Sequence, residues 1–111
     1  MKINQNTRDM VMRQLGHNEK HLGTEYIRAA LDMYEPGMAM TKELYPGIAR
    51  AYGTTPQRVE RSIRHSIGAA WTRSSGEAAL RFFASNIDGW PSNGEYIAVM
   101  ARLCRQAEGQ E

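Results

Sequence analysis

Arginine side chains are concentrated in one stretch of this chain, between Arg50 and Arg73. That stretch holds five arginines and a single acidic residue, Glu60, whereas the whole chain has a formal net charge of +2. A guanidinium group is a permanent cation, and its planar set of N–H donors bonds well to phosphate oxygens and to the O6 and N7 atoms of guanine. A local excess of such groups is the pattern expected of a surface that binds a polyanion, although an ordinary solvated helix face is the alternative.

The spacing of these residues favours the polyanion, because it places them on one face of a helix expected over about Thr55–Arg73. At about 100° per residue, apolar and polar positions separate to opposite sides of this helix. The expected buried side consists of Val59, Ile63, Ile67, Ala70 and Trp71, and the far side of Gln57, Arg61, Arg64, His65 and Gly68, flanked by Arg58 and Glu60. Only Glu60 is spaced to pair with one of the crowded arginines, Arg64. Cations near a helix N-terminus also oppose the helix dipole, and a bound polyanion would relieve both penalties.

The residue types along this face match the parts of duplex DNA. Thr54, Thr55 and Gln57 stand at the start of the helix, where hydroxyl, amide and backbone N–H groups can hold phosphate. Further along, arginine can read guanine, and Glu60 can accept a hydrogen bond from N4 of cytosine. The pattern therefore predicts a helix that reads base edges in the major groove.

The elements that must position this helix are expected to be helical throughout, because no period-two alternation lasts beyond four residues. Apolar periodicity and capping residues predict six helices. They cover about Thr7–Leu15, Thr24–Tyr34, Thr41–Tyr52 and Thr55–Arg73, a fifth after Ser74 that includes Glu77 and Phe83, and a sixth after Ser92. The third and fourth, separated by a turn at Gly53, have the pattern of a helix-turn-helix. The expected fold class is all-α, a six-helix domain that contains this motif.

The bulk composition limits the possible classes of protein. With 111 residues, 41% of them hydrophobic and 23% charged, residues 1–111 are expected to form a single globular domain. No apolar run is long enough for a membrane span, and the polar start lacks the apolar core of a signal peptide. Cys104 is the only cysteine and cannot form an internal disulfide, which fits a reducing cytoplasm.

Other residue combinations give weak support for catalysis or for a metal site. His17 and His21 are four residues apart, but a zinc site needs three or four ligands and Cys104 stands alone. Ser62 and Ser66 lie close to His65 in the sequence, but no acid is placed to orient the imidazole. The expectation is a protein that is not an enzyme and binds neither metal nor cofactor.

One stretch resembles a known family closely. The segment LYPGIARAYGTTPQRVERSIRHSIGAAW, Leu44–Trp71, is similar to the C-terminal effector domain of the master sporulation response regulator of endospore-forming bacteria. The segment TEYIRAALDMY resembles the second helix of that family, and PSNGEYIAVMARLCR resembles its last helix. The similarity is strongest in the RVERSIRH core, and it covers nearly the whole chain.

The resemblance implies a transcription regulator with six helices that binds a short DNA box close to TGTCGAA, often as two domains in tandem. Matched by position, Glu60, Arg61 and Arg64 resemble the base-reading residues. The backbone contacts or supporting residues implied in the same way are Thr54, Thr55, Arg58 and His65. The fifth helix, with Glu77, Arg81 and Phe82, resembles the surface through which the family activates RNA polymerase.

The chain also departs from the family pattern. The family's regulator carries a receiver domain with a phosphorylatable aspartate, and none is expected within residues 1–111. The loop before the last helix bears lysine in relatives and contacts the DNA backbone, whereas here it reads NIDGWPSN and contains Asp88, which would repel phosphate. Gly68 stands where relatives have a larger acidic residue. The glycine either allows DNA to approach closely or is simply tolerated. Trp90 is expected to pack under the last helix, with a subunit contact as the alternative.

A second function of a different class fits these departures. A protein-interaction module could pair with a full-length regulator or with RNA polymerase without reading DNA itself. The changed loop and the aromatic pair Phe82–Phe83 favour this alternative.

Overall fold

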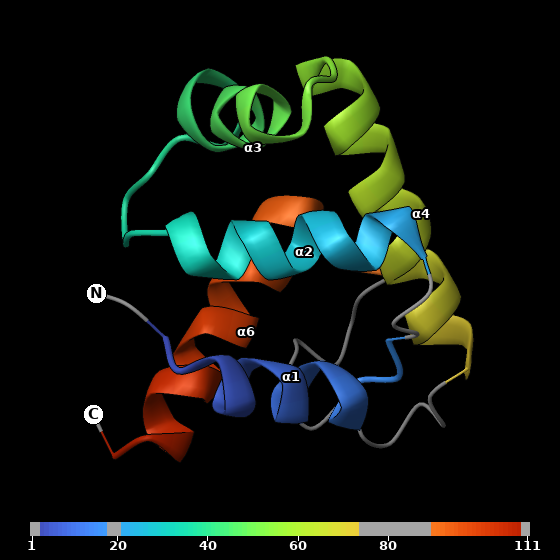
Figure 1. Cartoon of the computed structure of the whole chain (residues 1–111). Coiled ribbons are helices and arrows are strands. Elements are labelled where there is room, and N and C mark those ends of the chain that lie inside the picture. Colours follow the sequence, from blue (N-terminus) through green and yellow to red (C-terminus); the bar gives the residue numbers. More distant parts are fainter. Residues whose placement is uncertain (1–2, 18–20, 74–89, 110–111) are drawn as a thin grey trace.

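The structure is a computed structural model that describes residues 3–17, 21–73 and 90–109. Within these residues the chain forms helices and no strand (Figure 1). The helices are α1 (Gln5–Gln14), α2 (Leu22–Met33), the π-helical η1 (Met40–Leu44), α3 (Tyr45–Tyr52), α4 (Pro56–Arg73) and α6 (Asn93–Ala107). The predicted all-α class is therefore confirmed. The predicted fifth helix lies within residues 74–89, outside the described part of the chain.

Helix α2 is the central element of the molecule. It lies between α1 on one side and α3 on the other, and α4 runs along one edge of the molecule (Figure 1). Contacts join α2 to α1, α3, α4 and α6. The apolar side chains of α2 that pack in the centre, Ile27, Ala30 and Leu31, are fully buried. This single core supports α4 from behind.

The predicted boundaries of four helices agree with the structure to within two residues, and side chains cap the starts of α1 and α6. Asn4 caps α1, since its side chain accepts hydrogen bonds from the N–H groups of Asn6 and Thr7. Ser92 caps α6 by accepting a hydrogen bond from the N–H of Glu95. Each cap satisfies backbone donors that have no partner within the helix. Helices α2 and α4 also start and end near the predicted positions.

The third predicted helix, Thr41–Tyr52, differs from the prediction in its first turn. The chain adopts π-helical geometry over Met40–Leu44 before α3 begins at Tyr45. The N–H groups of Leu44 and Tyr45 donate to carbonyls five residues earlier, at Ala39 and Met40. Pro46 has no N–H to offer the carbonyl of Lys42, four residues earlier, and this favours the wider register.

Gly23 allows the backbones of α2 and α4 to come into direct contact. A Cβ atom built on Gly23, near the start of α2, would lie 2.3 Å from the carbonyl oxygen of Ser62 and 2.7 Å from Cβ of Ser66. No side chain fits at that distance, so the backbone of α2 rests directly against α4 at this point. The close contact fixes the position of α4 relative to the core.

Cys104 is fully buried on α6, as its apolar neighbours predict. Burial raises the pKa of its thiol to about 11, with a smaller contribution from Glu108. Because the thiolate is the reactive form, we expect negligible alkylation of the folded protein at pH 8 and rapid alkylation in 6 M guanidinium. The unfolded chain releases this proton first, so the thiol favours folding below about pH 8.5, and that contribution is lost as the pH rises toward 11. Comparable alkylation rates in both conditions would show that Cys104 is accessible.

No helix in the described ranges is long and apolar enough to cross a membrane.

Candidate nucleic-acid interface

A tight connection joins α3 to α4. Gly53 ends α3 in the left-handed conformation, with φ of +65°, which glycine adopts without strain. The N–H groups of Gly53 and Thr54 both donate to the carbonyl of Ala49. The hydroxyl of Thr55 then accepts a hydrogen bond of 3.2 Å from the N–H of Arg58, which caps α4 as predicted. The turn is therefore fixed at both ends, and the start of α4 has a defined direction.

Helix α4 has the two faces that its sequence predicts. Four residues of the expected apolar face are fully buried and Trp71 is partly buried; the four are Val59, Ile63, Ile67 and Ala70. The expected polar side is exposed at Gln57, Arg58, Arg61, Arg64 and His65, and Glu60 is half-buried beside them. Gly68 is the exception, because it is buried. We call Arg58, Glu60, Arg61, Arg64 and His65 the arginine face.

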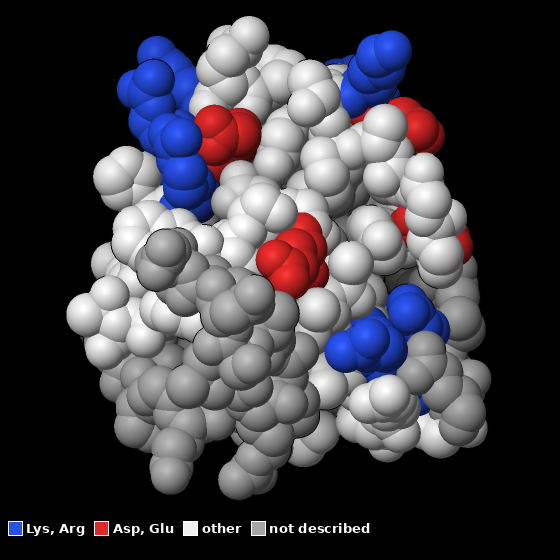
Figure 2. Space-filling model, turned by 180° about the vertical axis from the view of Figure 1, so that it is seen from behind, with Lys and Arg blue, Asp and Glu red and all other residues white. Residues whose placement is uncertain are grey.

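The arginine face is predominantly positive. Figure 2 shows basic side chains in a column along the edge of the molecule that α4 forms, with an acidic side chain against them. Nε of Arg64 lies 3.6 Å from Oε2 of Glu60, which is the pairing that their spacing predicts. The side chain of Arg64 is nevertheless 53% exposed. A long, exposed ion pair is worth little energy, so both groups can exchange it for contacts with a ligand.

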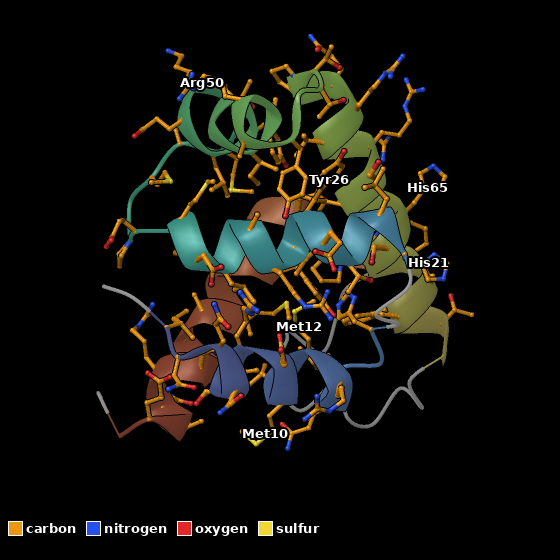
Figure 3. All side chains as sticks on the ribbon, in the orientation of Figure 1. Met10, Met12, His21, Tyr26, Arg50 and His65 are labelled. Carbon is orange, nitrogen blue, oxygen red and sulfur yellow. The ribbon has the colours of Figure 1, made fainter. Side chains whose placement is uncertain are left out.

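Beside this column, Thr55 and His65 are also exposed, and Thr54 is partly exposed. His65 points away from α4 into solvent, whereas Arg50 lies on α3 at the opposite side of the view (Figure 3). The hydroxyl hydrogen of Thr55 stays able to donate, because its oxygen acts as the acceptor in the cap. Thr54 is half-buried, and its N–H is used within the turn, so only its side chain can contact a ligand.

An asparagine that the sequence analysis did not single out holds this face in place. Asn93, the first residue of α6, is buried, and its Nδ2 donates to the hydroxyl of Tyr45, at 3.0 Å, and to the backbone carbonyl of Glu60, at 3.1 Å. One side chain thus joins α6, α3 and α4 beside the arginine face. Burial raises the pKa of Tyr45, so its hydroxyl stays neutral and can accept this bond. In the sequence, Asn93 looks only like the residue after a helix cap.

Asn93→Ala should lower the free energy of unfolding by about 1–2 kcal/mol, because two hydrogen bonds are lost and Tyr45 loses a partner inside the protein. Urea denaturation followed by circular dichroism measures this change. Asn6→Ala, at an exposed position in the first turn of α1, is the matched control and should change stability by less than about 0.5 kcal/mol. Equal effects of the two substitutions would contradict the bridging role of Asn93.

A buried polar chain supports α4 from the opposite side. The imidazole of His17 is hydrogen-bonded through Nε2 to the hydroxyl of Tyr96, at 2.9 Å, and through Nδ1 to the hydroxyl of Ser66, at 3.3 Å. Ser66 lies 3.5 Å from the hydroxyl of Thr24 on α2. Both ring nitrogens of His17 therefore have partners inside the protein. These hydrogen bonds could not be predicted from the sequence, because a buried hydrogen-bonded histidine has the same spacing as an exposed one.

The surroundings of Trp90 differ from those predicted. A Cβ atom built on Gly68 would lie 2.9 Å from Cζ2 of Trp90, so the indole ring covers Gly68 on α4. The sequence predicted that Trp90 packs under the last helix, and contact of its ring with α4 was not predicted. The missing side chain at Gly68 leaves room for the ring on α4, and the ring in turn closes Gly68 to any direct approach by DNA.

Four residues of interest, Glu77, Arg81, Phe82 and Asp88, lie outside the described residues, and their predicted roles stay predictions.

The family model described as sporulation initiation factor Spo0A C terminal matches residues 9–103 of this chain. The chain belongs to this family. The match includes α2, α3 and α4 entirely and α6 up to its last turn, so the residues that form the arginine face and its supports all lie within it. The Spo0A C-terminal family is the DNA-binding domain of a sporulation transcription factor, a regulatory domain and not a catalytic one.

Proposed function

We propose that this chain binds a specific sequence in double-stranded DNA, with α3 and α4 acting as a helix-turn-helix and α4 entering the major groove. The observation that carries the proposal is the exposed arginine face of α4, directly opposite its buried face. A helix with its side chains is about 10–12 Å across and the major groove is about 12 Å wide, so α4 at the edge of the molecule fits it (Figure 1).

Within this proposal, Glu60, Arg61 and Arg64 read base edges. Arg61 and Arg64 can each donate two hydrogen bonds to a guanine, and Glu60 can accept one from N4 of cytosine. Since Glu60 and Arg64 lie side by side at 3.6 Å, they suit neighbouring bases such as the CG step of TGTCGAA. The residues around them hold phosphate groups; these residues are Thr54, Thr55, Gln57, Arg58 and His65.

A mobility shift on a TGTCGAA duplex, compared with a scrambled duplex over a series of salt concentrations, tests the proposal. Specific binding should be about a thousandfold or more tighter than non-specific binding. Its affinity should fall steeply as the salt concentration rises. Equal affinity for both duplexes would contradict base reading. No binding to either, together with co-purification of a larger regulator, would favour the protein-interaction module.

The family resemblance also leads us to propose that the outcome of binding is transcription regulation and that two domains occupy tandem boxes. A duplex with two boxes should then give a second shifted band at higher protein concentration. A contact with RNA polymerase is proposed on the resemblance alone, because Glu77, Arg81 and Phe82 lie outside the described residues. Cytoplasmic location remains a prediction from the sequence.

A further inference from the structure

Trp90 is a large aromatic residue on the surface that stands just before α6 in the sequence but contacts α4. It directly precedes the Pro91–Ser92 cap of α6, yet its ring rests on α4, and the side chain is 45% exposed. The contact is specific to glycine, because a methyl group at position 68 would lie 2.9 Å from Cζ2 and 3.1 Å from Cε2 and Cη2 of the ring. Gly68 therefore leaves the space that the indole ring occupies, and we call this space the socket.

The socket places the indole next to a proposed base reader. Gly68 follows Arg64 by four residues, which is about one helical turn or about 6 Å along the axis. A hollow of about 500 Å³ beside the ring is lined by Arg64, His65, Gly68, Ala69, Thr72 and Trp90. A second hollow of about 460 Å³ includes Glu60, Arg64 and Trp90 among its lining residues. Trp90 and Arg64 thus border both hollows, and the indole lies beside the arginine face.

We propose that Trp90 is a further DNA-contacting residue, whose indole packs against the sugar–phosphate wall of the groove that α4 enters. This inference rests on the proposed function and adds a contact to it. Because α4 with its own side chains nearly fills a groove about 12 Å wide, a ring carried on its surface has no room on the groove floor. The ring therefore meets the wall, one turn beyond the residues that read bases.

The chemistry of indole suits this position. Its faces are apolar and can cover a deoxyribose, and its Nε1–H can donate to a phosphate oxygen. Unlike arginine, it carries no charge and releases no counterion when DNA binds. Trp90 should therefore contribute affinity that does not depend on salt concentration, whereas Arg58 should contribute affinity that does.

Trp90→Ala should weaken binding to the TGTCGAA duplex about tenfold and leave the slope of log Kd against log salt unchanged. Arg58→Ala, by comparison, should reduce that slope by about one. Met10→Ala is the matched control, because Met10 is 38% exposed on α1 and points away from the arginine face (Figure 3). Trp90→Phe keeps an aromatic ring and should retain part of the affinity, and urea midpoints of all variants show whether each is folded.

Fluorescence gives a second readout that a purely structural role would not move. In a Trp71→Phe background, Trp90 is the only tryptophan of the chain. Titration with the TGTCGAA duplex should change the intensity and wavelength of its emission, and the midpoint should equal the Kd from the mobility shift. An unchanged spectrum at saturation would overturn the proposal.

Gly68→Ala tests the socket. The added methyl group must displace the ring, so this variant should lose part of the affinity that Trp90 provides. In a Trp90→Ala background the same substitution should have no further effect on affinity. If the wild-type chain binds the box specifically and Trp90→Ala binds equally well, the inference fails while the proposed function stands. If the wild-type chain binds the specific and the scrambled duplex equally, the proposed function and this inference both fail.

Discussion

Arg61→Ala is expected to weaken binding to the TGTCGAA duplex by about 1–3 kcal/mol, roughly fivefold to more than a hundredfold, and to relax the preference at one base pair. Arg61 lies on the exposed side of α4, so its removal costs the fold little. Arg64→Ala should cost at least as much, because Glu60 would then face the duplex without its partner at 3.6 Å. Competition binding against duplexes changed at each position of the box measures both effects.

Arg50→Ala is the control for charge alone. Arg50 is exposed on α3 and lies at the other side of the molecule from His65 (Figure 3). It should change affinity only slightly and equally for all sequences. For Arg64, a second substitution separates two causes: Glu60→Gln in the Arg64→Ala background should recover the part of the loss that comes from phosphate repulsion. If Arg61→Ala weakens specific and scrambled duplexes equally, Arg61 contacts only phosphate.

Gly23→Ala is expected to have the largest effect on stability, a loss of about 3 kcal/mol in the free energy of unfolding. The added Cβ would lie 2.3 Å from the carbonyl oxygen of Ser62, and backbone cannot move aside as a flexible side chain can. Helices α2 and α4 would have to separate, which would weaken packing across the core. A loss of this size is a substantial part of the stability of a typical domain.

Gly47→Ala is the matched comparison, because it makes the same change within α3. Its Cβ would lie 3.5 Å from the sulfur of Met33, which is an ordinary contact. This variant should be as stable as the wild type or up to about 1 kcal/mol more stable, since alanine is the better helix former. Urea denaturation of both variants would settle the matter, and an unchanged midpoint for Gly23→Ala would show that the helices do not meet so closely.

The sequence predicted what depends on local patterns. The two faces of α4 follow from residue spacing alone, and the caps by Thr55 and Ser92 follow from residue type next to an apolar period. The start of α3 was predicted less well, because it does not follow from a local apolar pattern. The period of Leu44 and Ile48 is helical in either register, and the wider register depends on the missing N–H of Pro46.

The contacts that hold the arginine face in place could not be predicted, because they join residues far apart in the chain. Asn93 contacts Glu60 across 33 positions, and His17 contacts Ser66 across 49. Gly23 and Gly68 carry no side chain whose pattern could be read, and each is important for what it lets approach. A glycine within or beside a predicted helix is compatible with such a contact, but it does not show which residue approaches.

A hydrogen bond joins the residue before α1 to the residue after α6, and it has a practical consequence for experiments. The N–H of Asn4 donates to Oε2 of Glu108 at 2.8 Å, so the two ends of the described chain meet on the side of the molecule away from α4 (Figure 1). An affinity tag, a surface tether or a fluorescent fusion attached at either end would extend away from a bound duplex. The neighbouring ends also suit a circular permutant, in which a short linker joins them and new termini open elsewhere.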